Sequence, residues 1–267
     1  MSKVDDLKKM LKDMNSVAVA FSGGVDSTYL LKVAHDVLGD RCIAVTALSP
    51  SFPDSENKEA REFCKSEGIK QVFVNPEEYK VEEYAVNPPN RCYYCKHILF
   101  SGMKKVAEEY GCNYILEGTN ADDINDYRPG MKAIEELGVR SPLRETGFTK
   151  EEIRQESNLL HLPTWDKPSF ACLASRFPYG TRITEEGLLK IQKAEEVLKD
   201  LGFKQYRVRY HNDVARIEVL PDDIIKLVSG DIRSQISSRI KAAGFRYVAI
   251  DIDGYRTGSL NEGIKEV

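Results

Sequence analysis

A glycine-containing bend near the N-terminus combines residue types that bind phosphate. The bend "SGGVDS" consists of Ser22, Gly23, Gly24, Val25, Asp26 and Ser27. Its backbone amides can form a concave anion site, and a helix starting here would add the positive end of its dipole. Ser22 and Ser27 would donate hydroxyls, and Asp26 would bind Mg²⁺ or cap the helix. The bend has neither the lysine of a Walker A loop nor the glycine spacing of a dinucleotide fingerprint, and an ordinary capped turn is the alternative.

A second polar segment, "EGTNADDINDYRPG", spans residues 117–130. Its charged side chains after the first glutamate are Asp122, Asp123, Asp126 and Arg128. One or two of these carboxylates can hold Mg²⁺ against phosphates, with the arginine balancing charge, and a solvated acidic loop is the alternative. Lys150 and Arg154, one helical turn apart, either face the same phosphates or lie at the surface.

Three of the six cysteines lie in polar surroundings where they can do chemistry. Cys92 and Cys95 are three residues apart at the start of an expected helix, and Cys172 lies in the proline-bounded loop "KPSFACLASRFPYG". A single CxxC motif is compatible with a redox pair, half of a zinc site, or two small core residues. The other three cysteines are expected in the core, because they adjoin apolar strands or helix faces: Cys42, Cys64 and Cys112.

Paired arginines occur in the C-terminal part of the chain. Arg207 and Arg209 are two apart on an expected strand, so their guanidinium groups share one face, as do Arg216 and Glu218 on the returning strand. Two such groups offer fork-shaped donors for a carboxylate or a phosphate. The alternative is a solvated sheet face with ion pairs between its strands.

The elements that must position these residues follow an alternating pattern. Apolar runs at 17–21, 42–48, 71–74 and 113–116 alternate with helical patterns, which predicts a parallel sheet with helices on both faces and ligands at the carboxyl ends of its strands. From residue 183 a helix, a hairpin turning at residues 212–213, a second helix and a strand predict a small α+β domain. The expected domains are 1–165 and 183–267, with an ordered linker at 166–182 that carries Cys172.

Composition limits the classes of function. The chain has 267 residues and a net charge of −4, which disfavours tight nucleic-acid binding because phosphate contacts need clustered lysine and arginine. No apolar run approaches the roughly 18 to 20 residues that span a bilayer, and the first residues contain no signal-peptide pattern. We therefore expect a cytoplasmic protein that uses neither a membrane nor a nucleic acid, with cysteines as thiols or metal ligands.

The loop "SGGVDS" resembles the pyrophosphate loop of N-type ATP pyrophosphatases, also called PP-loop enzymes, over about residues 15–165. The resemblance implies an adenine nucleotide alpha-hydrolase-like α/β fold that binds ATP and Mg²⁺. It implies that the loop holds the β,γ-pyrophosphate while the bond between the α- and β-phosphates breaks. Four residues match a segment beside ATP in that superfamily: Gly118, Thr119, Asn120 and Asp123.

Over nearly its whole length the chain resembles the LarE family, through "CLASRFPYG" together with the loop and "DDINDYRPG". These sulfur transferases act on pyridinium-3,5-biscarboxylic acid mononucleotide. The resemblance implies that a substrate carboxylate is adenylated and converted to a thiocarboxylate. It also implies an anion site at Arg207, Arg209 and Glu218, and a homo-oligomer. Ser175 and Arg176, beside Cys172, are weaker candidates.

The resemblance leaves the sulfur source open. Members with a single cysteine at the position of Cys172 sacrifice its sulfur, whereas members with three cysteines carry a 4Fe-4S cluster that relays sulfide or another donor's sulfur. The presence of Cys92 and Cys95 favours the cluster. A tRNA thiolase, an ammonia-using synthetase and a non-catalytic nucleotide-binding module remain as alternatives.

Overall fold

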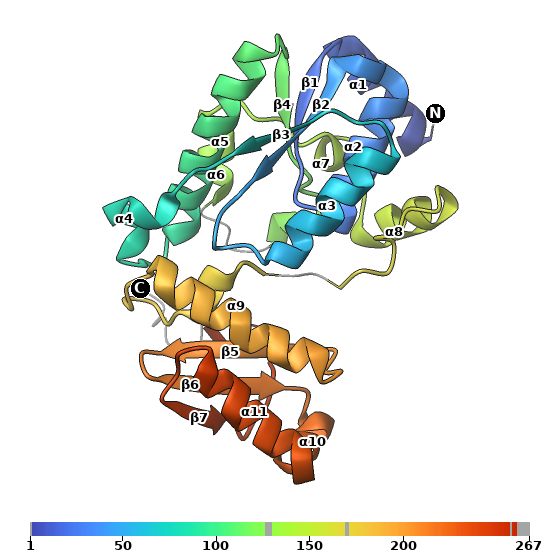
Figure 1. Cartoon of the computed structure of the whole chain (residues 1–267). Coiled ribbons are helices and arrows are strands. Elements are labelled where there is room, and N and C mark those ends of the chain that lie inside the picture. Colours follow the sequence, from blue (N-terminus) through green and yellow to red (C-terminus); the bar gives the residue numbers. More distant parts are fainter. Residues whose placement is uncertain (1, 126–129, 169–170, 257, 261–267) are drawn as a thin grey trace. The chain divides into compact units, whose positions relative to one another are not determined.

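The computed structural model describes residues 2–125, 130–168, 171–256 and 258–260 (Figure 1). It divides into two compact units, one formed by residues 1–78 and 90–170 and the other by residues 79–89 and 171–267. Asp126 and Arg128, considered above for Mg²⁺ and phosphate, lie outside the described residues. Among the described residues, no helix combines the length and the apolar character that crossing a membrane requires.

The first unit is built on a parallel sheet. Its described strands are β1 (Val17–Ala20), β2 (Cys42–Ala47), β3 (Gln71–Val74) and β4 (Tyr114–Leu116). They lie in the order β3-β2-β1-β4, and each neighbouring pair is parallel. This confirms the predicted strands. Because β1 lies between β2 and β4, the segments that follow β1 and β4 emerge side by side at one edge of the sheet.

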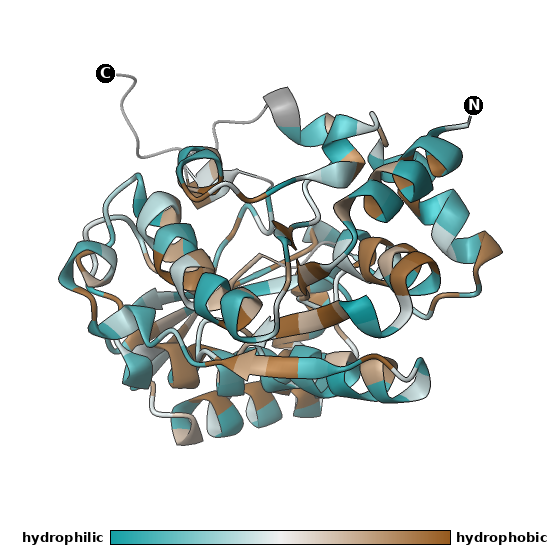
Figure 2. Ribbon diagram, turned by 90° about the horizontal axis from the view of Figure 1, so that it is seen from above, coloured by the Kyte–Doolittle hydropathy of each residue, from teal (hydrophilic) through white to brown (hydrophobic). Residues whose placement is uncertain are grey.

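Helices cover both faces of this sheet. The described helices of the unit are α1 (Lys3–Met14), α2 (Val25–Leu38), α3 (Asp54–Ser66), α5 (Arg91–Glu109), α6 (Gly130–Glu136), α7 (Pro142–Glu145) and α8 (Lys150–Leu159). Buried residues of α1, α2, α3 and α8 pack on one face of the sheet, and those of α5 and α6 on the other. In Figure 2 the strands are largely brown, whereas the helices alternate teal and brown.

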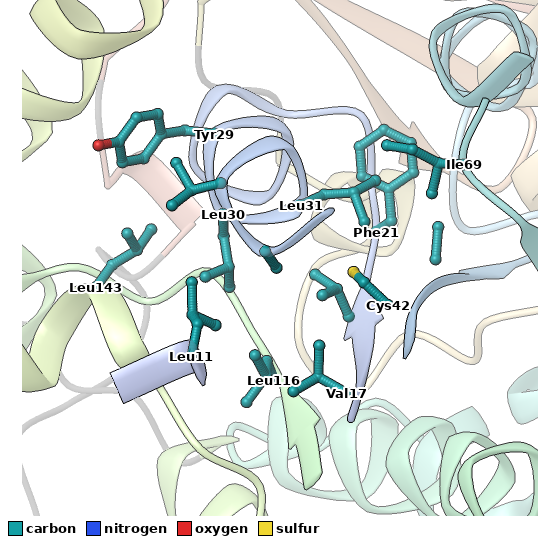
Figure 3. Close-up of a cluster of buried hydrophobic side chains, with 14 of the residues drawn as sticks. Leu11, Val17, Phe21, Tyr29, Leu30, Leu31, Cys42, Ile69, Leu116 and Leu143 are labelled. Carbon is teal, nitrogen blue, oxygen red and sulfur yellow. The ribbon is translucent and has the colours of Figure 1, made fainter. Parts of the chain in front are cut away.

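The core around α2 fixes where that helix begins. Figure 3 shows Leu30 and Leu31 of α2 amid side chains of α1, β1 and β4, among them Leu11, Val17 and Leu116. All five of these side chains are fully buried. Full burial of such side chains is worth about 1.5 to 3 kcal/mol each, so the start of α2 is held firmly at the end of β1.

The second unit combines a small mixed sheet with helices. Its described elements are α4 (Glu82–Ala85), α9 (Glu185–Asp200), β5 (Tyr206–His211), β6 (Val214–Val219), α10 (Ile224–Val228), α11 (Gly230–Ala242) and β7 (Tyr247–Ile250). Strands β5 and β6 form the predicted hairpin, and β7 pairs parallel to β6. Thr184 caps α9 as expected, because its side chain accepts a hydrogen bond from the Gly187 amide at 3.1 Å.

Residues 79–89 join this second unit although they lie far from it in sequence. The Ile183 amide donates to the Ala85 carbonyl at 2.8 Å, and the Gly180 amide donates to the Asn87 carbonyl at 2.9 Å. The buried Asn87 side chain donates to the carbonyl of Pro178 at 2.8 Å. These bonds tie the segment to the chain that follows Cys172.

Candidate active site

The "SGGVDS" bend connects β1 to α2 at the carboxyl edge of the sheet. Gly23 has a φ of 73°, a backbone conformation that favours glycine. Gly24 is the N-cap of α2 and supplies no side-chain cap, so an anion can approach the first-turn amides. The Ser22 and Ser27 hydroxyls lie 3.1 Å apart, and Ser27 also donates to the Gly24 carbonyl at 3.1 Å.

The segment after β4 packs directly against this bend. A Cβ atom at Gly118 would lie 3.1 Å from the Ser27 amide nitrogen and 3.3 Å from the Asp26 Cβ, which is tighter than ordinary contact. Only glycine therefore fits here without movement. Two residues further on, the Asn120 side-chain amide donates to Asp26 Oδ1 at 3.3 Å. The structure thus brings the two segments together at Asp26.

The two basic residues of α8 have different roles. Lys150 forms an ion pair with Asp26, and its backbone amide donates to Asp122 Oδ2 at 2.7 Å. Arg154 instead donates to the carbonyls of Trp165 and Lys167, at 2.7 and 2.8 Å. Lys150 therefore faces the bend, whereas Arg154 holds the chain that leaves α8.

A buried carboxylate stabilises the segment after β4. Glu117 is 7 % exposed and accepts hydrogen bonds from the Thr119 amide at 3.1 Å and the Thr119 hydroxyl at 2.7 Å. It also accepts one from the Ser141 hydroxyl, and Lys96 of α5 lies 3.9 Å away. Asp123 accepts the Asn120 amide at 3.1 Å. These bonds hold Thr119 and Asn120 in place. Sequence reasoning missed Glu117, because its partners are identified only by the fold.

Two of the three cysteines predicted to lie in the core are buried in the structure. Cys42 and Cys64 are buried, and burial raises the pKa of each thiol to about 12. Cys92 is exposed and Cys95 half-buried in the first turns of α5. Cys172 is half-buried at the N-cap of a short 3₁₀ helix, Leu173–Arg176, in the second unit.

No three His, Cys, Asp or Glu side chains form a ready metal-binding group within the described ranges. Cys92 and Cys95 nevertheless suit a thiolate-bound metal, because they lie one turn apart on one helix and are at least partly exposed. Cys112, the remaining cysteine, is half-buried, and burial raises the pKa of its thiol. It packs against the core formed with α5 and α6.

The second unit contains a pocket of about 350 Å³ with three arginines in its wall. Its lining residues are Pro89, Arg176, Pro178, Tyr179, Arg209, His211, Arg216, Ser259 and Leu260. Arg209 forms a two-pronged ion pair with Glu218, at 2.9 and 2.7 Å, and donates to the Ser175 carbonyl at 2.8 Å. Glu218 is 1 % exposed, so it orients Arg209 from behind the wall.

Arg207 and His211 differ in their relation to this pocket. Arg207 was predicted beside Arg209, but it is not among the residues that line the pocket. It donates to the Tyr206 carbonyl at 2.6 Å and lies over the Tyr255 ring. His211 lines the pocket and was not predicted. Burial and then the nearby Arg216 lower the pKa of His211, so the ring is neutral at pH 7.

Arg176, a weak candidate from sequence, holds the backbone around Cys172. It is fully buried and pairs with Glu195 at 2.8 and 2.9 Å. It also donates to the carbonyls of Ala171 and Cys172, at 2.8 and 3.1 Å. The Ser175 hydroxyl donates to the same Cys172 carbonyl at 2.8 Å. The cysteine therefore has a fixed backbone within its unit.

A parallel α/β sheet with a lysine-free, glycine-containing bend after its first strand is the arrangement expected of the PP-loop ATP pyrophosphatase class of enzymes. No family model matches the chain. It is 43 % identical over 260 residues to an uncharacterized protein of Synechocystis sp., covering 97 % of both chains. It is 39 % identical to the pyridinium-3,5-bisthiocarboxylic acid mononucleotide synthase of Lactiplantibacillus plantarum, over 98 % of this chain and 94 % of that protein.

A more distant relative is one of the subunits of the glutamine-hydrolysing GMP synthase of Archaeoglobus fulgidus, 27 % identical over 60 % of this chain and 55 % of that protein. The likeness to this GMP synthase supports the PP-loop class. The likeness to the Lactiplantibacillus plantarum synthase extends over both units. The chain therefore belongs to the LarE family of ATP-dependent sulfur transferases.

Proposed function

We propose that this enzyme uses ATP to adenylate a carboxylate of pyridinium-3,5-biscarboxylic acid mononucleotide and then converts that carboxylate to a thiocarboxylate. The name of the Lactiplantibacillus plantarum relative, a pyridinium-3,5-bisthiocarboxylic acid mononucleotide synthase, supports this choice of product. The observation that carries the proposal is the meeting of the "SGGVDS" bend and the segment after β4 at Asp26.

In the first step a substrate carboxylate oxygen attacks the α-phosphorus of ATP, and the bond to the β-phosphate oxygen breaks. Pyrophosphate leaves with the bonding electron pair. The amides of the bend and the Ser22 hydroxyl are placed to donate hydrogen bonds to it, and the Ser27 hydroxyl can do so by turning from the Gly24 carbonyl. Asp26 offers carboxylate oxygens for Mg²⁺, which when bound would neutralise phosphate charge, and the Asn120 side-chain nitrogen orients that carboxylate. Lys150 is a cation that can turn from Asp26 toward a phosphate.

The arginine pocket of the second unit suits the anionic groups of the substrate. Arg176, Arg209 and Arg216 line it, and its volume of about 350 Å³ lies within the range of small-molecule sites. Glu218 accepts from the Nε and Nη2 edge of the Arg209 guanidinium, while Nη1 and Nη2 also donate to the Ser175 carbonyl and the Ser259 hydroxyl, at 2.8 and 2.9 Å. The second Nη1 hydrogen is the donor proposed for a phosphate or carboxylate oxygen. Arg207, two residues before Arg209 on β5, stays a proposed ligand for the same anionic groups.

In the second step sulfide or another sulfur donor attacks the acyl carbon. The carbon–oxygen bond to AMP breaks, AMP leaves, and a thiocarboxylate forms. We propose that Cys92, Cys95 and Cys172 hold a 4Fe-4S cluster for this step, since all three thiols are at least partly exposed. Held by three thiolates, such a cluster would supply a binding position for the attacking sulfide at the iron without a cysteine.

The test of the first step measures pyrophosphate and AMP released when the pyridinium substrate is added to enzyme, ATP and Mg²⁺. Asp26→Asn should lower the rate by at least tenfold, because it removes a ligand charge from the metal and its ion pair with Lys150. Asp36→Asn is the matched control, since Asp36 is also an α2 aspartate paired with a lysine but lies away from the bend. Equal rates in all three proteins would refute the assignment.

The test of the second step is anaerobic purification with assays of iron and sulfide. The unchanged chain should hold about four irons, and Cys92→Ala or Cys172→Ala should lose them. Cys112→Ala, which removes a half-buried cysteine outside the set, should keep them. An iron-free protein in which Cys172 becomes dehydroalanine after one turnover would support sacrificial sulfur donation instead.

We further propose that the enzyme works in the cytoplasm as a homo-oligomer without nucleic acid. The net charge of −4 supports the last point. Saturating tRNA should leave AMP formation unchanged, whereas a large stimulation would favour a tRNA thiolase.

A further inference from the structure

Lys167 contacts the phosphate bend from a part of the chain 144 residues away. Its ammonium lies 3.2 Å from the Gly23 carbonyl oxygen and 2.7 Å from carboxylate oxygens of both Glu56 and Glu59. The side chain is 17 % exposed. Burial opposes its charge, but the hydrogen bonds with the two glutamates outweigh this and raise the pKa of Lys167. It is therefore a cation at neutral pH.

The Gly23 carbonyl lies on a side of the bend that phosphate avoids. Gly23 and Lys167 both line a pocket of about 640 Å³, and Glu59, Glu62 and Asp166 lie in its wall. The single ammonium of Lys167 is already matched against two carboxylates. Lys167 is thus no phosphate ligand, and an anion must approach the bend from the opposite side.

Peptide geometry links these two sides. In a trans peptide the carbonyl of one residue and the amide of the next point in opposite directions. A hydrogen bond that holds the Gly23 carbonyl toward Lys167 therefore holds the Gly24 amide away from the acidic pocket. Ser22 Oγ lies 3.4 Å from that amide, on the side of the serine hydroxyls. Gly23 needs such a restraint, because a glycine with a φ of 73° has many other conformations available.

The lysine itself is held by the fold. Arg154 of α8 donates to the Trp165 and Lys167 carbonyls, which fixes the backbone of this segment. The backbone at Trp165 and Lys167 is thereby held beside the bend.

We propose that Lys167 is a positioning residue that orients the Gly23–Gly24 peptide for the β,γ-pyrophosphate of ATP. This inference rests on the proposed function, since it takes the bend as the pyrophosphate site. Loss of this role should weaken the binding of ATP but not of AMP, whereas a general loss of structure would weaken the binding of both. AMP lacks the β- and γ-phosphates, so its binding should not depend on Lys167.

The experiment measures binding of Mg·ATP and of AMP to the full chain by calorimetry. Lys167→Met should weaken ATP binding about tenfold and leave AMP binding within twofold, since hydrogen bonds to charged groups are worth about 1.5 to 3 kcal/mol and 1.4 kcal/mol is tenfold. Lys32→Met is the matched control: Lys32 also lies between two carboxylates, of Asp36 and Glu67, and is similarly exposed, but makes no contact with the bend. It should bind both nucleotides normally.

Without Lys167, the charges of Glu56 and Glu59 would themselves repel ATP. A triple variant, Lys167→Met with Glu56→Gln and Glu59→Gln, separates this repulsion from the loss of the contact with Gly23. If its ATP affinity stays at least fivefold below normal, the contact with Gly23 is responsible. Full recovery of ATP affinity would overturn the inference, as would equal weakening of ATP and AMP. Failure of the unchanged chain to bind ATP would instead overturn the proposed function.

Discussion

Gly118→Ala is expected to damage the site through a single added methyl group. The new Cβ would lie 3.1 Å from the Ser27 nitrogen and 3.3 Å from both the Asp26 carbonyl carbon and the Asp26 Cβ. These are backbone or near-backbone atoms at the start of a buried helix. The start of α2 and residue 118 must therefore move apart by a few tenths of an ångström. Overpacking of this kind costs about 1 to 3 kcal/mol.

The same shift acts on catalysis, because Asp26 belongs to the proposed Mg²⁺ and phosphate site. A misplacement of about 1 Å costs roughly 100-fold in rate, so a smaller shift should lower AMP formation about tenfold. The chain has one tryptophan, Trp165, in the first unit. Its fluorescence during urea unfolding measures the stability of that unit, and a coupled pyrophosphate assay measures the rate.

Gly102→Ala is the control, since a Cβ at Gly102, within α5, meets no atom within 4 Å. Alanine there should be neutral or stabilise the helix by about 0.5 to 1 kcal/mol. The reasoning is refuted if Gly118→Ala unfolds at the same urea concentration as the unchanged chain and forms AMP at the same rate.

Three further outcomes follow from charge and burial. Glu218→Gln removes the partner of the buried Arg209 and should destabilise the second unit by about 3 kcal/mol in urea unfolding followed by circular dichroism; a loss below about 1 kcal/mol would contradict this. The ion pair with Lys3 lowers the pKa of Glu152 from 4.5 to about 2. The stabilisation by this pair is therefore present above pH 4.5 and is lost as the pH falls toward 2. Thermal melts of the unchanged chain and of Glu152→Gln should converge over that range. At pH 8 a thiol reagent should leave Cys42 unmodified in the native protein by peptide mass spectrometry, because its pKa is about 12, and rapid modification would count against its burial.

Much of the fold could be predicted because its strands carry strong local patterns. The runs at 17–21, 42–48, 71–74 and 113–116 became β1 to β4 with boundaries shifted by at most one residue. Their order in the sheet could not be obtained in this way, because periodicity says which segments are strands but not which strands pair. The placement of residues 79–89 in the second unit depends on hydrogen bonds to residues about 90 positions later, which no local pattern encodes.

In the candidate site, too, the residues in a local motif could be predicted, and those that depend on distant contacts could not. The position of the bend was predictable because its glycines, serines and aspartate are contiguous and follow an apolar strand. Lys150 stayed ambiguous until the fold placed it against Asp26, 124 residues away. Glu117 and Lys167 were missed because a single glutamate or lysine in a polar segment resembles any solvated charge, and their importance comes from burial and distant partners.

The contacts of the acidic residues distinguish a metal ligand from residues that shape the loop. Asp122 accepts the Lys150 backbone amide and Asp123 accepts the Asn120 backbone amide, so moving either carboxylate would break the turn. Asp26 instead contacts the side-chain ammonium of Lys150, which can rotate away, and the side-chain amide of Asn120, whose oxygen is held by the Asp122 amide at 2.9 Å. A carboxylate that exchanges partners without unfolding its surroundings can accept Mg²⁺ when ATP arrives. Asp26 is therefore the best placed of the three to bind the metal, and Lys150 would then be released toward the phosphates.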